Sequence, residues 1–204
     1  MTILRMSSGR YVNLETLNHD DIDVYDISNS LNQLKRFVGH YKDKEPLTVA
    51  QHTFLVMDIA RIIYPKDDEV LYDCLLHDFG EAYYGDIPTP VKSVLGENIR
   101  PFLKYVDEVI YGKLWRCPTL PRVTPEIKEK TKLCDLLALD IERRVIWSDQ
   151  SGKENWPELP VPRMEWQWTL RQKNDMFRRV ARHPYINLAK TYMQMTYPNK
   201  RFRT

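Results

Sequence analysis

Two His-Asp dipeptides in this chain place an imidazole beside a carboxylate, a pairing that can bind a metal ion. His19-Asp20 lies in a polar stretch, residues 18–23, which favours a turn with solvated side chains. His77-Asp78 instead ends an apolar segment, where a charged carboxylate is costly unless it is paired or metal-bound. Because no Lys or Arg lies within one helical turn of Asp78, this second dipeptide is the candidate for metal binding.

Two further residues of ligand type occupy similar apolar settings. His52 lies among apolar residues of one predicted helix, and Asp135 lies between apolar residues of another. Taken singly, each is better explained by a satisfied core histidine or a helix-capping aspartate. Together with His77 and Asp78 they bring two imidazoles and two carboxylates toward one core, a ligand set that suits Zn²⁺, Mn²⁺, Fe²⁺ or Co²⁺.

The spacing of apolar residues predicts the helices that would position this cluster. Thr48 and Gln51 form a capping box for a helix that ends at Pro65, and Thr124 begins a helix that continues to about Trp147. The other predicted elements are a short strand pair within residues 1–20, helices over 26–37, 67–80 and 99–110, a loop or broken turn over 83–92, an irregular connector over 148–163, and helical sequence over 165–197 with a break at Pro184. This pattern predicts an all-α bundle of six to eight helices with a short irregular or β-like N-terminal segment.

Length and composition narrow the class of protein further. A chain of 204 residues fits a single domain over 1–204, and a net charge of +2 does not favour a nucleic-acid-binding surface. Three cysteines without CxxC spacing argue against a disulfide framework or a cysteine-based zinc site. No apolar run has the length of a signal peptide or a membrane span, so we expect a soluble cytoplasmic protein.

The order His52, His77-Asp78, Asp135 resembles the H…HD…D signature of HD-domain metal-dependent phosphohydrolases. The similarity covers roughly residues 8–146. Within the family, the sequence resembles in particular the bacterial 5'-deoxynucleotidases and the phage dATP triphosphohydrolases. The matching segments are 48–52, 77–82, 85–92 and 132–135. Three N-terminal segments, 9–10, 26–27 and 34–40, resemble the phage members of the family in particular. The motif core would span about 26–147, with a C-terminal helical extension over about 165–197.

The resemblance implies roles for the candidate site residues. His52, His77, Asp78 and Asp135 would hold the catalytic metal ion, with Zn²⁺ preferred and Co²⁺, Mn²⁺ or Mg²⁺ as alternatives. Two acidic residues, Glu81 and Asp86, would handle the attacking water or the leaving group. Glu81 lies four residues after His77, on the same helical face. Without the family match, a solvated helix end for Glu81 and a turn-forming aspartate at position 86 would be the favoured explanations.

Four more residues resemble substrate contacts of the family. Arg36 and Lys92 would bind phosphate, for which the planar guanidinium of an arginine is well suited. Phe37 and Pro90 would enclose the nucleobase. The alternatives are a surface lysine at position 92 and a core aromatic ring at position 37.

The function that this resemblance implies is hydrolysis of dATP to deoxyadenosine and tripolyphosphate by attack on the α-phosphorus. A 5'-deoxynucleotidase that releases phosphate from deoxynucleoside monophosphates would use the same residues, and a non-catalytic nucleotide-binding module is a further alternative. A nucleic-acid-binding role has some support from a basic cluster at Arg171, Lys173, Arg178, Arg179 and Arg182 and from the tail 200–203, but the spacing fits a solvated helix face. We therefore expect a small deoxynucleotide as partner, neither nucleic acid nor membrane, and a homo-oligomer, located in the host cytoplasm if phage-encoded.

Overall fold

The computed structural model describes residues 2–42, 44–116, 122–147 and 168–198. These described residues are mostly helical, with 67% helix and 5% strand, which confirms the all-α prediction. The connector predicted over 148–163 lies outside the described residues. None of the helices in the described segments combines the length and the apolar character needed to cross a membrane.

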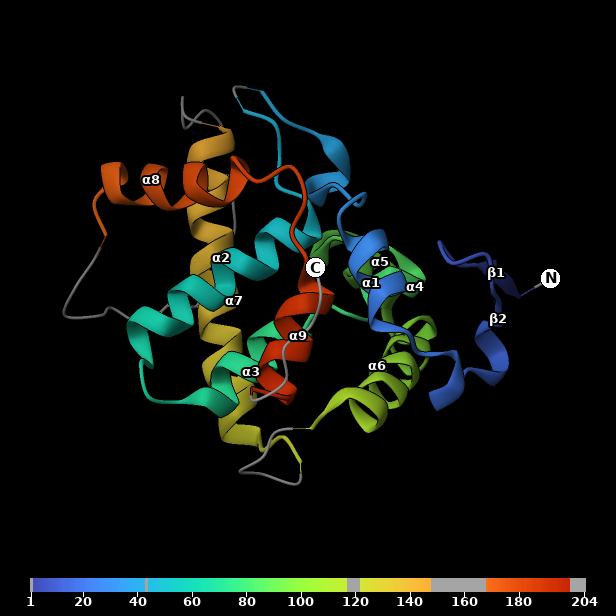
Figure 1. Ribbon diagram of the computed structural model, residues 1–204. Helices are drawn as coiled ribbons and strands as arrows, with labels where there is room; N and C mark the ends of the chain where they lie inside the picture. Colours follow the sequence, from blue (N-terminus) through green and yellow to red (C-terminus); the bar gives the residue numbers. More distant parts are fainter. Residues whose placement is uncertain (1, 43, 117–121, 148–167, 199–204) are drawn as a thin grey trace.

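Three helices, α2 (Val49–Ile63), α3 (Asp68–Leu76) and α7 (Pro125–Ile146), pack against one another at the centre of the fold. Figure 1 shows the long α7 running behind α2 and α3. The predicted capping box of α2 is present, because the Thr48 side chain accepts from the Gln51 backbone N–H and the Gln51 side chain accepts from Thr48. The hydroxyl of Thr124 likewise caps α7, as its sequence predicts.

The remaining helices cover this centre on two sides. Helix α8 (Leu170–Ala181) packs across α2 and α7, while α1 (Val24–Leu31) packs against α9 (Leu188–Thr196). Helices α4 (Glu81–Tyr84), α5 (Thr89–Leu95) and α6 (Arg100–Leu114) form the other side in Figure 1. The break between α8 and α9 falls where Pro184 predicts it.

The predicted N-terminal strand pair is present as β1 (Ile3–Arg5) and β2 (Tyr11–Asn13), which pair antiparallel with Leu4 opposite Val12. The first His-Asp dipeptide lies in a 3₁₀ turn, His19–Asp21, capped by Asn18, and both side chains are exposed. The structure therefore agrees with a solvated turn for His19-Asp20.

The prediction of one helix over 26–37 is wrong. Helix α1 ends at Leu31, because the Asn32 side chain turns back and donates to the carbonyl oxygens of Ser28 and Ile186. A 3₁₀ turn follows over Arg36–Gly39, in which Phe37 (φ 57°) and Val38 (φ 55°) adopt the left-handed conformation. A tertiary contact with the C-terminal segment thus overrides the helical periodicity, and local sequence does not encode that contact.

The prediction of a loop or broken turn over 83–92 holds only for residues 85–88, since residues 83–84 belong to α4 and residues 89–92 to α5. The two prolines that suggested a loop occupy positions where a helix tolerates them. Pro88 is the N-cap residue of α5, and Pro90 lies in its first turn. Helix α3 likewise ends at Leu76, so that His77 and Asp78 lie in the turn before α4 rather than within one long helix.

The N-terminal hairpin is fastened to α1 through the carboxylate of Asp26, which is 2% exposed. The Asp26 oxygens accept from the Ser7 hydroxyl, from the backbone N–H and hydroxyl of Ser8, and from Arg10. Burial opposes ionisation, but the hydrogen bonds from Ser7 and Ser8 outweigh it and lower the pKa of Asp26. Two of the phage-like N-terminal residues, Arg10 and Asp26, thus have a structural role.

We expect Asp26→Asn to lower the free energy of unfolding at pH 7 by about 1–3 kcal/mol, since it weakens hydrogen bonds to a buried charge. The folded-state pKa is lowered, so the contribution is complete above about pH 4 and is lost as the pH falls through the folded-state value. Urea unfolding of both proteins at several pH values measures this difference. A gap that stayed constant down to about pH 2 would contradict the assignment.

Candidate metal centre

The central helices bring the four predicted ligands together. His52 lies in the first turn of α2 and is fully buried, His77 and Asp78 follow α3, and Asp135 lies in the middle of α7. The Nε2 atom of His52 is 3.6 Å from Asp78 Oδ2 and 3.2 Å from Asp135 Oδ1, and His77 Nε2 is 3.1 Å from Asp78 Oδ2. Residues from α2, from the turn after α3 and from α7 therefore converge on one point, as the sequence predicts.

His52, His77 and Asp78 form a group that could hold a metal ion, because one ligand atom from each lies within 4.8 Å of the others. Asp135 is adjacent to this group, but its two carboxylate oxygens contact different residues. Its Oδ1 atom faces His52, while its Oδ2 atom accepts from Lys132 at 2.7 Å. The three-residue group is thus the best defined part of the candidate site.

The hydrogen bonding of the two imidazoles fits metal ligation. The Nδ1 atom of His77 lies 2.8 Å from the carbonyl oxygen of Cys74, and a hydrogen bond between them requires a proton on Nδ1. In a neutral ring with this tautomer, Nε2 carries the free lone pair. Nε2 of His77 and both ring nitrogens of His52 are buried and have no hydrogen-bond partner in the described structure. Buried polar atoms are normally satisfied, so the two unpaired Nε2 atoms, which face carboxylates, fit a cation between them.

The electrostatics of the cluster also favour positive charge at this point. Burial opposes ionisation of Asp78, but the neighbouring His77 imidazole outweighs it and holds the Asp78 pKa well below its usual value. Burial disfavours the charged form of His77 as well, yet the Asp78 carboxylate raises the His77 pKa to about 9. A proton or a metal ion is therefore stabilised among these residues.

Arg36 supplies the cationic neighbour that Asp78 lacks in the local sequence. It reaches the cluster from the 3₁₀ turn after α1, and its Nη1 atom lies 3.8 Å from Asp78 Oδ2. Its side chain is only 12% exposed. Although burial disfavours the charged guanidinium, the carboxylates of Glu142 and Asp78 raise the pKa of Arg36 and keep it charged. The site therefore contains a fixed positive charge beside the candidate metal ligands.

Glu142 of α7 is a site residue that the sequence reasoning missed. Its side chain is completely buried, and its Oε2 atom lies 3.2 Å from both Arg36 Nε and His52 Nδ1. A signal was present, because Glu142 follows Asp135 by seven positions, about two helical turns, and lies on the apolar stripe beside Ile141 and Val145. A glutamate on such a stripe indicates a buried charge with a partner.

The two predicted acid-base residues lie within electrostatic range of the cluster. Glu81 begins α4 and is buried, and its Oε2 atom has no hydrogen-bond partner in the described structure. Burial, together with the charges of Asp78 and Asp86, raises the pKa of Glu81 well above its usual value. Burial also raises the pKa of Asp86, which is half-buried, while Arg36 opposes this shift. Glu81 is therefore a candidate proton donor.

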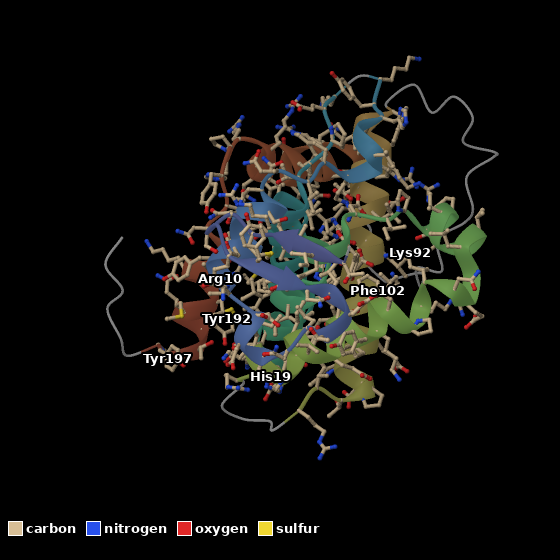
Figure 2. The ribbon with its side chains drawn as sticks, turned by 90° about the vertical axis from the view of Figure 1, so that its right-hand side faces the viewer. Arg10, His19, Lys92, Phe102, Tyr192 and Tyr197 are labelled. Carbon is tan, nitrogen blue, oxygen red and sulfur yellow. The ribbon has the colours of Figure 1, made fainter. Side chains whose placement is uncertain are left out.

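The three remaining predicted substrate residues are less closely assembled. Lys92 is half-buried on α5, and its charge opposes the upward shift of the Glu81 pKa. Figure 2 shows Lys92 toward the opposite end of the molecule from Tyr192 and Tyr197 of the C-terminal segment. The Phe37 ring packs edge-on against Trp147 at 5.2 Å, and Pro90 is exposed. The structure gives Phe37 a protein partner, so enclosure of a base between Phe37 and Pro90 stays a prediction.

The fold and the site define a mostly helical protein with a His-His-Asp group, buried at His52 and partly buried at the other two residues, that could hold a metal ion. No family model matches the chain. It is 32% identical over 159 residues to the uncharacterized protein YfdR of Escherichia coli K12, covering 78% of this chain and 79% of YfdR. It is also 31% identical over 144 residues to the uncharacterized protein RCAP_rcc00048 of Rhodobacter capsulatus, covering 70% of this chain and 71% of that protein. The chain therefore belongs to the family of YfdR and RCAP_rcc00048.

Proposed function

We propose that the protein is a metal-dependent phosphohydrolase that acts on deoxynucleotides, with dATP as the preferred substrate and Zn²⁺ as the preferred metal ion. One observation carries the proposal: the group of buried His52 and partly buried His77 and Asp78 has unpaired imidazole nitrogens and lies beside the largely buried guanidinium of Arg36. The resemblance of the chain to HD-domain phosphohydrolases supports the reaction and the substrate class. A divalent metal ion bound here supplies a Lewis acid and lowers the pKa of water.

The residues around the metal site bind the phosphate and transfer the protons. Arg36 binds an oxygen of the α-phosphate, and its fixed charge stabilises the negative charge that develops during attack. Asp86, whose pKa is raised by burial, accepts a proton from the attacking water. Glu81 holds a proton because its pKa is also raised, and it delivers this proton to the 5' oxygen as the bond between that oxygen and the α-phosphorus breaks. The products are then deoxyadenosine and tripolyphosphate.

A product assay tests this proposal. The protein is incubated with each deoxynucleoside triphosphate and monophosphate in the presence of Zn²⁺, Co²⁺ or Mn²⁺, and tripolyphosphate, pyrophosphate and phosphate are resolved. We expect tripolyphosphate and deoxyadenosine from dATP. The absence of cleavage with every substrate and metal ion would contradict the phosphohydrolase assignment, and release of pyrophosphate would contradict cleavage of the bond between the α-phosphorus and the 5' oxygen.

A 5'-deoxynucleotidase is the second candidate, and the charge pairing on the surface favours it. A triphosphate requires more cationic partners than a monophosphate. Two lysines that could serve this purpose already have carboxylate partners, because Lys35 pairs with Glu45 at 2.9 Å and Lys104 pairs with Glu108 at 3.5 Å. Phosphate release from several deoxynucleoside monophosphates in the same assay would select this alternative.

The basic cluster on α8 gives less support to nucleic-acid binding than its sequence suggests. Lys173 lies within hydrogen-bond distance of Asp140, and Arg179 pairs with Asp58 at 3.2 Å. These ion pairs neutralise part of the positive charge on the helix. A small deoxynucleotide therefore stays the proposed partner.

A further inference from the structure

Glu142 contacts two functional groups with a single oxygen atom. Its Oε2 atom accepts a hydrogen bond from Arg36 Nε and lies 3.2 Å from His52 Nδ1. The Glu142 and His52 side chains are both completely buried, so solvent does not screen this arrangement. A buried carboxylate is costly in itself, which means that its partners must compensate for the loss of hydration.

The two nitrogens of the His52 ring face different groups. Nε2 faces the carboxylates of Asp78 and Asp135, and Nδ1 lies within ion-pair distance of Glu142 but without hydrogen-bond geometry. A carboxylate beside Nδ1 favours a proton on that nitrogen, which leaves the Nε2 lone pair free to bind a metal ion. Carboxylates in this position orient metal-binding histidines and increase their basicity.

We propose that Glu142 is a positioning residue that holds His52 in the metal-binding tautomer and at the same time fixes Arg36 beside the substrate phosphate. This inference rests on the proposed metal-dependent function. Arg36 comes from the turn after α1, His52 from α2 and Glu142 from α7, so one carboxylate joins three separate parts of the fold. Metal affinity and phosphate binding are therefore coupled through the same atom.

The test measures metal affinity directly, with Co²⁺ as the probe. Glu142→Gln retains the shape of the side chain but removes its charge, and Glu129→Gln makes the same change at an exposed position of α7. We expect Glu142→Gln to weaken Co²⁺ binding by about ten- to a hundredfold and to alter the visible Co²⁺ absorption bands. The Glu129→Gln control is expected to bind Co²⁺ as the unaltered protein does.

The possible outcomes separate the two proposals. If the unaltered protein binds no Co²⁺, the proposed metal-dependent function fails and the role of Glu142 fails with it. If the unaltered protein binds Co²⁺ and folded Glu142→Gln binds it equally well with the same spectrum, only the role of Glu142 is overturned. A purely structural ion pair between Glu142 and Arg36 would lower the free energy of unfolding but leave the Co²⁺ spectrum of the folded fraction unchanged.

Two further measurements apply if Glu142→Gln does not fold. Glu142→Asp retains the carboxylate on a shorter side chain, and we expect its Co²⁺ affinity to be partly preserved. In the unaltered protein loaded with Zn²⁺, long-range ¹H–¹⁵N NMR correlations report which ring nitrogen of His52 carries the proton. A proton on Nδ1 is expected, and an unprotonated Nδ1 would overturn the inference.

Discussion

Replacing Asp78 with asparagine is expected to reduce hydrolysis by about a thousandfold or more and to weaken metal binding strongly. The carboxylate of Asp78 lies near both imidazoles of the candidate metal group, 3.6 Å from His52 Nε2 and 3.1 Å from His77 Nε2. A neutral amide would leave the group without its central negative charge. Loss of a metal ion that stabilises the transition state by several kcal/mol corresponds to about three powers of ten in rate.

The chain contains its own control for this experiment. Asp20 belongs to the other His-Asp dipeptide and is exposed, so Asp20→Asn makes the same chemical change next to a histidine outside the site. We expect its metal content and hydrolysis rate to match those of the unaltered protein. Metal content after dialysis and initial rates with the preferred nucleotide are the measurements. Full activity in Asp78→Asn would disprove the metal site.

Phe79→Ala is expected to lower the free energy of unfolding by about 3–5 kcal/mol, because it removes a large ring from a closely packed interior. Phe79 is 0% exposed and is among the largest fully buried side chains of the described residues. It also directly follows Asp78, so the same packing determines where that carboxylate lies. We therefore expect weaker metal binding in addition to the loss of stability.

Urea unfolding monitored by circular dichroism measures the effect of Phe79→Ala. Val94→Ala is the matched control, since Val94 is 87% exposed on α5 and its truncation should change stability by no more than about 0.5 kcal/mol. A loss below about 1 kcal/mol for Phe79→Ala would mean that the interior next to Asp78 is not packed as described.

The sequence predicts the central helices well because their signals are local. Thr48 with Gln51, and Thr124 with Pro125, are capping patterns whose effect depends only on neighbouring residues, and both helices begin where these patterns place them. The apolar periodicity then orients His52 and Asp135 toward the core. For this reason the convergence of the four predicted ligands could be predicted before the structure was known.

The sequence reasoning failed where distant segments decide the conformation. Helix α1 stops at Leu31 through a contact with residue Ile186, and Asp78 obtains its guanidinium partner from Arg36, far outside its own helical turn. Glu142 was missed for a related reason. Its neighbours in space, Arg36 and His52, belong to other elements, so only its position on an apolar stripe indicated that it is buried.

The pairing of Asn32 with Ile186 has a consequence for how this chain folds. The Asn32 amide donates to the Ile186 carbonyl oxygen, and the Ile186 backbone N–H donates to the Asn32 side chain, so each residue satisfies the other. These partners are separated by 154 positions, and bringing them together requires closing a long loop. During synthesis on a ribosome, all the proposed metal ligands would emerge well before Ile186. The end of α1 is therefore expected to become ordered last, after nearly the whole chain has been made.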